Sequence, residues 1–228
     1  MLQVLNEYPG AVAEAPAAEA GDPVGQLRER FGRFFRLFLW AHVPVAGLVA
    51  FVDGHSPLLF LALAAAAAGL ATAAGAFGGS GPAARQVASV AAIGMTAVLI
   101  AAASGSGYQI DMHMYVFAMM AVLLGWCDWR VFPPAVLVVA IHHLALNVVH
   151  PAAVFPDGSD YARVLLHAAI VVVEAVVLAV LARRLEDTME RSRILAEEAG
   201  AASDKARLYA ADVERRREGE AERQRRVG

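Results

Sequence analysis

The sequence predicts an all-α fold, a polytopic membrane bundle of about six transmembrane helices with a C-terminal cytoplasmic helix or coiled coil. Composition is the first indication, because 58 % of the 228 residues are apolar, only 18 % are charged and the mean hydropathy is +0.52. That balance is typical of membrane proteins. Charge distribution is the second, since residues 37–182 hold very few charges whereas residues 183–228 are rich in Arg and Glu. The third is a series of long apolar runs separated by short polar turns.

Each apolar run is close to the length that crosses a bilayer. A hydrocarbon core about 30 Å thick needs roughly 20 helical residues at a rise of about 1.5 Å per residue. Turn-forming Gly, Pro, Asp and Ser residues separate the runs. The predicted spans are residues 34–52, 57–77, 86–105, 112–128, 131–150 and 161–182.

Positive residues predict the orientation of these spans, because Lys and Arg stay on the cytoplasmic side of a bacterial inner membrane. The opposite side has only Arg163 near a span end. Both termini are therefore expected in the cytoplasm, and the loops 53–56, 106–111 and 151–160 in the periplasm. The expected cytoplasmic cations are Arg28, Arg30, Arg33, Arg36, Arg85, Arg130, Arg183 and Arg184.

Three segments follow from this layout. Residues 1–22 lack a basic region followed by an apolar one, so no cleaved signal peptide is expected, and their composition predicts a disordered leader. Residues 23–182 form the six-helix transmembrane domain, and residues 183–228 form a cytoplasmic helical extension. A net charge of −3 gives no reason to expect a nucleic-acid partner.

The single cysteine excludes an intramolecular disulfide and a cysteine-based metal motif. Cys127 falls in the turn between the fourth and fifth spans, where we expect a small buried side chain. The adjoining Asp128-Trp129-Arg130 predicts a capped turn with an aromatic anchor at the membrane interface.

Imidazoles gather in the last three spans, where ionisable side chains are costly and indicate function. His113 begins the fourth span, His150 ends the fifth, and His143 lies about 10 Å below His150. His167 lies roughly 9 Å below the same surface in the sixth span. Three consecutive helices are thus expected to bring imidazoles to the periplasmic leaflet.

Helical spacing places further polar residues around this cluster. Asn147 shares a face of the fifth span with His143, whereas His142 points about 100° away. In the sixth span, Glu174 shares a face with His167 and lies about 10 Å deeper. His42, in the first span, lies at a depth at which it could partner Glu174.

Converging neutral imidazoles suit a transition metal ion or an axially ligated haem b. A hydrogen-bonded network that holds the helices together is a third interpretation, and the sequence leaves all three open. Two nearby thioethers favour copper over zinc, because soft sulfur prefers Cu(I), although methionine in an apolar helix more often serves packing. The candidate cofactor ligands are His113, His142, His143 and His167; the candidate metal ligands are His113, His143, His150, His167, Met112 and Met114; and Asp111, Asn147, Glu174 and His42 are candidate partners of the ligands or proton relays.

Five segments carry a resemblance to a known family: Asp111-Met-His-Met-Tyr-Val-Phe, Cys127-Asp-Trp-Arg, Ile141-His-His-Leu-Ala-Leu-Asn, Val154-Phe-Pro-Asp-Gly, and Leu166-His-Ala with Glu174. Residues 111–174 resemble the N-terminal membrane sensor region of some bacterial methyl-accepting chemotaxis proteins and of related receptors that end in diguanylate cyclase domains. The resemblance implies a non-catalytic input domain for signal transduction, in which the histidines at 113, 142, 143 and 167 matter. It does not name their ligand. No signalling hairpin or catalytic domain follows Gly228, so we expect the output on a longer chain or on a partner.

Two other functions stay open at this point. An intramembrane electron carrier or oxidoreductase of the haem cytochrome type needs histidine pairs on two leaflets or a quinone pocket, and only His42 lies below the outer cluster. A small metal or proton transporter, with Glu174 and His42 as relay groups, needs polar groups through the inner leaflet. The second and third spans supply almost none.

The C-terminal extension is rich in Ala, Glu and Arg and has no proline before Gly228, which predicts a helix. Small and apolar residues recur with alternating spacings of four and three, which indicates a loose coiled coil in a homodimer. A solvated single helix with ion pairs between residues four apart is the alternative. The predicted seam consists of Leu185, Met189, Ser192, Ala196, Ala199, Ser203, Ala206, Ala210 and Val213.

Overall fold

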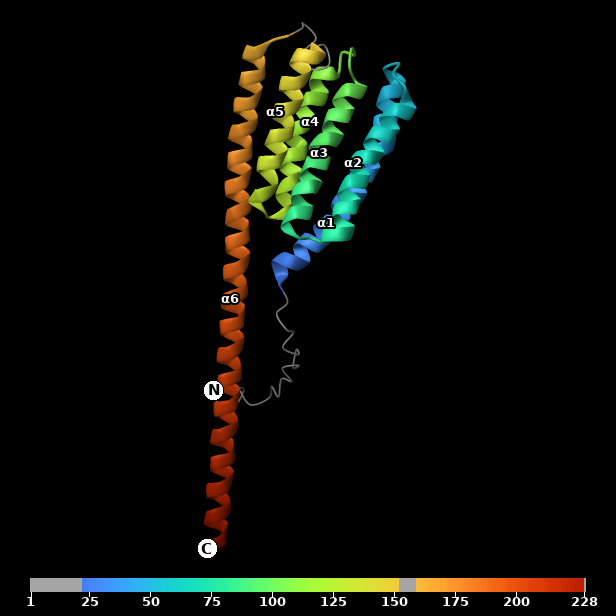
Figure 1. Ribbon diagram of the computed structural model, residues 1–228. Helices are drawn as coiled ribbons and strands as arrows, with labels where there is room; N and C mark the ends of the chain where they lie inside the picture. The colour runs from blue at the N-terminus through green and yellow to red at the C-terminus, as the bar shows by residue number, and fades with distance from the viewer. Residues whose placement is uncertain (1–21, 152–158, 228) are drawn as a thin grey trace, which may run out of the picture. The chain divides into compact units, whose positions relative to one another are not determined.

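The computed structural model describes residues 22–151 and 159–227. Within them the chain is helical and forms no strand. The predicted leader, apart from its last residue, and most of the last predicted periplasmic loop lie outside the described residues. The helices are α1 (Pro23–Val52), α2 (Pro57–Gly78), α3 (Pro82–Ala102), α4 (Gln109–Leu123), α5 (Phe132–Val149) and α6 (Tyr161–Val227), with two 3₁₀ turns, η1 (Leu124–Trp126) and η2 (Trp129–Val131), between α4 and α5 (Figure 1).

The prediction of an all-α fold with six long apolar helices is confirmed. Each of the six helices, with η1 extending α4 and η2 extending α5, is long and apolar enough to cross a membrane. Boundaries differ most in the first helix, which begins at Pro23, 11 residues before the predicted span. The Arg-rich stretch before the apolar run stays helical because Arg is a good helix former. The third helix ends at Ala102, three residues earlier than predicted.

Proline and glycine set the helix ends, as their backbone restrictions require. Pro57 and Pro82 occupy the first turns of α2 and α3, where a missing N–H costs nothing. Gly79 ends α2 with a φ of 58° and donates its N–H to the carbonyl of Gly75 at 3.0 Å. That left-handed conformation favours glycine.

The described residues form two units, a bundle of residues Val24–Glu190 and the part of α6 that follows Glu190. In the bundle, α3 lies between α2 on one side and α4 and α5 on the other (Figure 1). α3 is also the most buried of the six apolar helices. Its contact with α2 is rich in small residues, which let helix backbones approach closely. Buried residues of this contact include Ala64, Ala68, Ala71, Ala88 and Ala92.

α6 contributes only one face to the bundle. Val164, Val171, Ala175 and Ala182 are its buried residues, and they recur at intervals of seven and four, which keeps them on one side of the helix. An apolar groove with a volume of about 440 Å³ lies between α5 and this part of α6. The contact between the two helices is therefore incompletely filled.

The second unit, the end of α6 beyond Glu190, is a helix with nearly all of its side chains exposed. It has ion pairs between residues four apart, Arg193 with Glu197 at 2.6 Å and Asp212 with Arg216 at 2.9 Å. These pairs stabilise a single helix. The helical prediction for the extension is confirmed, whereas its pairing into a coiled coil stays a prediction.

A buried ion pair fixes the turn between α4 and α5. Asp128 is fully buried, and its Oδ2 accepts hydrogen bonds from Nε and Nη2 of Arg85 on α3 at 2.8 and 2.6 Å. Its Oδ1 accepts the backbone N–H of Arg130 at 3.0 Å, so Asp128 also caps η2. The predicted capping role is confirmed, and the structure adds the pairing with Arg85.

Candidate functional site

Four imidazoles lie together where α4, α5 and α6 are neighbours. The ring centroid of His143 on α5 lies 5.9 Å from that of His113 on α4 and 5.7 Å from that of His167 on α6. The ring of His142 is 5.4 Å from that of His143. All four candidate cofactor ligands therefore form one group, which we call the imidazole cluster. His143 is buried and central, and the other three rings are half-buried around it.

Backbone carbonyls orient three of these rings. Nδ1 of His113, His143 and His167 lies 2.8, 2.9 and 2.9 Å from the carbonyl oxygen of the residue four positions earlier. Because a carbonyl oxygen can only accept, Nδ1 carries the proton and donates it, and Nε2 keeps its lone pair. Histidines that bind metals have the same arrangement, in which one ring N–H is held by an acceptor and the other nitrogen faces the metal.

Two of the Nε2 atoms have no partner among the described residues. Nε2 of His113 and Nε2 of His142 are buried and accept or donate no hydrogen bond. A buried polar atom without a partner is costly. A ligand bound to these nitrogens would remove that cost.

The remaining candidate metal ligands are His150, Met112 and Met114, which differ in burial. His150 is exposed at the C-terminal end of α5 and makes no ring contact with the four imidazoles among the contacts described. Met114 is 61 % exposed on α4, and Met112 packs against the apolar core. The four imidazoles of the cluster are themselves nitrogen donors.

The predicted partners of the ligands are scattered around the cluster. Asn147 is buried one turn beyond His143, and its Oδ1 accepts the backbone N–H of Asp160 at 2.8 Å, which ties α5 to the start of α6. Asp111 is exposed on α4. Glu174 is half-buried on α6, with a buried Oε2 that has no partner among the described residues.

His42 is paired with a residue that the sequence did not single out. Its Nδ1 donates to the carbonyl of Phe38 at 2.7 Å, so its Nε2 accepts from the hydroxyl of Tyr115 on α4 at 2.5 Å. The structure thus gives His42 the partner Tyr115, and no hydrogen bond joins it to Glu174 in the described part of the chain. The sequence signal that could have pointed to Tyr115 is its position two residues after His113, in the same predicted span.

The imidazole nitrogens are suitable metal ligands, but their rings are spaced too widely to hold a metal ion as they stand. Bond lengths of about 2.0–2.1 Å place the ring centroids of two ligating imidazoles roughly 5 Å apart, and the observed separations are somewhat longer. In the described residues, no group of three or more His, Cys, Asp or Glu side chains has the geometry to hold a metal ion. Binding would therefore require the rings to move closer together.

Haem fits this group less well. A haem iron takes at most two axial imidazoles, one on each face, so two of the four rings would have no role. The arrangement favours a mononuclear metal ion over haem.

Comparisons with protein-family models, with curated proteins and with solved structures find no match to this chain.

Proposed function

We propose that this chain is a sensory input domain of the bacterial inner membrane, and that its imidazole cluster binds a transition metal ion. The observation that carries the proposal is the convergence of four imidazoles from α4, α5 and α6. Ionisable side chains within apolar helices are costly and mark functional sites. The residues proposed as ligands are His113, His143 and His167, with His142 as a fourth.

Copper is the metal that this donor set favours. Imidazole nitrogen suits zinc, copper, nickel and iron, and Cu²⁺ binds most tightly among divalent ions of the first transition row. Met114 is 61 % exposed and Met112 packs against the apolar core, so the preference for copper rests here on the imidazole nitrogens and not on soft sulfur. Zinc is the second choice for an all-imidazole site.

Orientation follows from the distribution of Arg residues. Arg28, Arg85 and Arg130 lie at the end of the bundle that holds the turn between α4 and α5, and the imidazole cluster lies toward the other end. The rule that cations stay cytoplasmic supports placing both termini in the cytoplasm. The imidazole cluster would then open toward the periplasm and sample metal there.

α6 is the element that would carry the response. It holds His167 near its start and continues as one helix to Val227. The groove of about 440 Å³ between α5 and α6 leaves room for a shift of α6 when His167 is drawn toward a metal. A two-state displacement of a helix is a common switching device. We propose that the extension pairs with that of a second copy and passes the shift to a cytoplasmic signalling domain or partner.

Hydrogen–deuterium exchange on the purified full chain tests this proposal. The protein is measured after chelation and after addition of Cu²⁺ or Zn²⁺, in the wild type and in the variants His167→Ala and His55→Ala. His55 is the matched control, because its Nε2 lies 2.9 Å from the carbonyl of Ser104 and it belongs to another part of the bundle.

We expect metal to slow exchange in residues 161–176 and to change it in residues 191–227. Both effects should persist in His55→Ala and vanish in His167→Ala. Metal binding that leaves exchange in the extension unchanged would refute the input function but would still support the metal site. If neither region responds and no metal binds, the proposal fails as a whole.

A further inference from the structure

The Arg-rich end of the bundle contains a second polar site, between α1 and α2. An open cleft with a volume of about 220 Å³ is lined there by Glu29, Arg33 and Arg36 of α1 and by Gly75, Gly79 and Ser80 at the end of α2. A narrow cavity of about 10 Å³, close to the size of one water molecule, continues inward and ends at Trp126. Gly32, Arg36, Gly75 and Gly79 line both spaces.

The guanidinium of Arg36 lies in this space without an ion-pair partner among the described residues. Arg28 and Arg85 at the same end of the bundle bind carboxylates and carbonyl oxygens. Arg36, by contrast, makes no hydrogen bond or ion pair within residues 22–151 and 159–227, although it is half-buried. A half-buried cation without partners is costly unless an anion joins it.

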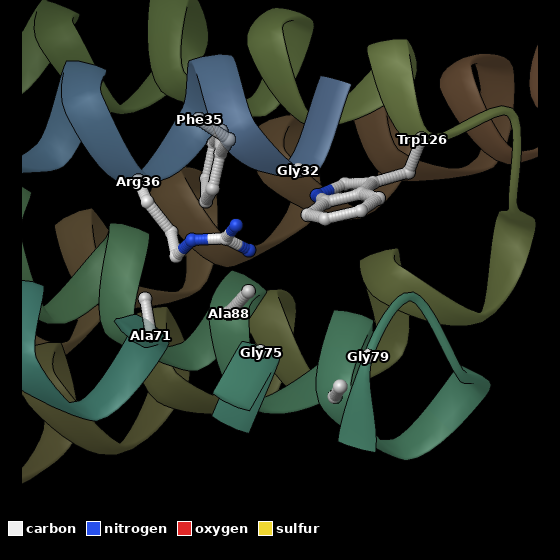
Figure 2. Close-up of a pocket in the computed structure, with 9 residues that line it drawn as sticks. Gly32, Phe35, Arg36, Ala71, Gly75, Gly79, Ala88 and Trp126 are labelled. Atoms are coloured by element: carbon white, nitrogen blue, oxygen red, sulfur yellow. The ribbon is translucent and has the colours of Figure 1, made fainter. Parts of the chain in front are cut away.

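A second donor without a partner faces the same cavity. Trp126 is 4 % exposed, and its indole N–H has no hydrogen-bond partner among the described residues. Figure 2 shows the Trp126 indole and the Arg36 guanidinium reaching into one space from opposite sides, with Phe35 beside them. Because both groups can only donate, their missing partner is an acceptor.

Glycine keeps the space open. A Cβ at Gly75 would lie 2.6 Å from Nη1 of Arg36, and a Cβ at Gly32 would lie 3.1 Å from the Trp126 ring. Either side chain would press on a donor that lines the site. By comparison, a Cβ at Gly69, also on α2, would meet nothing within 4 Å.

We propose that this cleft binds the phosphate of an anionic phospholipid headgroup. Arg33 and Arg36 supply the charge, the Ser80 hydroxyl adds a donor, and the acceptor that reaches the Trp126 N–H is a phosphate oxygen or a water molecule beneath it. Basic pockets between transmembrane helices on the cytoplasmic side suit anionic headgroups. The site is independent of the imidazole cluster.

The surface next to the cleft favours a lipid over a free phosphate. Arg33, Leu37 and Trp40 follow a spacing of four and three and share one face of α1, with Leu37 71 % and Trp40 44 % exposed. The Trp40 indole donates to Thr72 of α2 at 3.0 Å, so this face borders the contact between the two helices. A headgroup at Arg33 thus has apolar surface beside it for its acyl chains.

Thermal unfolding of the detergent-purified full chain tests the site. Dioleoyl phosphatidylglycerol, dioleoyl phosphatidylcholine and inorganic phosphate are added in separate titrations. We expect phosphatidylglycerol to raise the Tm of the wild type by about 3–5 °C and phosphatidylcholine to raise it by less than about 1 °C. Equal shifts with inorganic phosphate alone would overturn the lipid assignment, and equal shifts with both lipids would overturn the anionic site.

Two pairs of variants separate binding from folding. Arg36→Gln should abolish the difference between the two lipids, whereas Arg30→Gln, on the same helix but outside the cleft, should keep it. Gly75→Ala leaves every charge in place but crowds the guanidinium and should reduce the difference, whereas Gly69→Ala should not. A preserved difference in both Arg36→Gln and Gly75→Ala would refute the proposal.

Glu29 gives a test in the opposite direction. Its exposed carboxylate lines the mouth of the cleft and opposes an anion there. Glu29→Gln should therefore lower the concentration of phosphatidylglycerol needed for half of the Tm shift, by about 2-fold to 5-fold. A weaker effect of the lipid on this variant would contradict the proposed position of the phosphate.

Discussion

Arg28 on α1 and Glu186 on α6 form an ion pair, with Nη2 of Arg28 2.8 Å from Oε1 of Glu186. The same guanidinium donates to the carbonyl oxygens of Trp126 and Cys127, at 3.1 and 2.7 Å. One side chain thereby joins the first helix, the turn after α4 and the last helix. It lies at the point where α6 leaves the apolar part of the bundle.

We predict that Arg28→Ala destabilises the bundle more than Glu186→Ala. Loss of Arg28 leaves two carbonyl oxygens unbound and should cost about 2 kcal/mol. Loss of Glu186 removes only a partly exposed ion pair and should cost under about 1 kcal/mol. Unfolding in mixed micelles measures both, with the exposed Glu214→Ala as the control. Equal losses for the two variants would show that the carbonyl contacts contribute nothing.

Mutation of the buried pair of Arg85 and Asp128 should destabilise the protein more than mutation of Arg28 or Glu186. Asp128→Ala leaves the Arg85 guanidinium buried without its carboxylate and should lower the free energy of unfolding by about 3–5 kcal/mol. Asp187→Ala, which removes an exposed carboxylate, should stay within about 0.5 kcal/mol of the wild type. Replacing both members of the pair, as Arg85→Met with Asp128→Leu, should restore much of the loss, and a larger loss in the double variant would contradict this account of the turn.

Cys127 should ionise at higher pH than an ordinary thiol. It is buried, and burial raises its pKa, while the nearby Arg28 lowers that pKa by a smaller amount. At any pH near neutrality the thiolate fraction is therefore smaller than in an exposed cysteine, and alkylation should be slow. The rate of reaction with a maleimide, followed against pH, should reach its midpoint above the range of a free thiol. A midpoint below that range would show that the charge of Arg28 outweighs burial.

The extension should pair along its predicted seam. Single cysteines placed at Met189 or Ala199 should join two copies through a short bismaleimide in membranes, and a cysteine at Glu197 should do so at least about 3-fold less. The wild type, with only its buried Cys127, is the control. Equal cross-linking at all three positions would favour the solvated single helix that the ion pairs of Arg193 and Arg216 support.

Much of the fold was predictable from the sequence, because apolar run length and turn residues are local properties. Pro57, Pro82 and Gly79 lie at helix ends for reasons that act within a few residues. Hydropathy does not predict the early start of α1, because it locates only the apolar part of a helix, and the Arg-rich turns before that part are also helical.

The candidate site was predictable only in part. Depth along each helix brought His113, His143 and His167 to one level, and the structure places them together. Side-chain partners need the rotation of each helix about its axis, which no single apolar run defines. For that reason His42 was matched by depth to Glu174, whereas its hydrogen bond is to Tyr115.

The charged contacts were the least predictable features. Arg28, Arg36 and Arg85 are alike in the sequence, and all three are counted as cytoplasmic cations. In the structure they have three different roles: Arg28 joins helices, Arg36 borders a cleft and Arg85 neutralises a buried carboxylate. Those roles depend on residues about 40 to 160 positions away.

The metal content and absorption spectrum of the wild-type protein, gently extracted from membranes, test the central claim most directly. The account predicts copper or zinc at about one atom per chain, without a Soret band, and a loss of most of that metal in His113→Ala and His167→Ala but not in His55→Ala. A Soret band would show that the cluster binds haem and not a mononuclear metal ion. Protein that carries neither metal nor haem and takes up neither copper nor zinc, with histidine variants that only unfold more easily, would contradict the account and make the imidazole cluster a structural network.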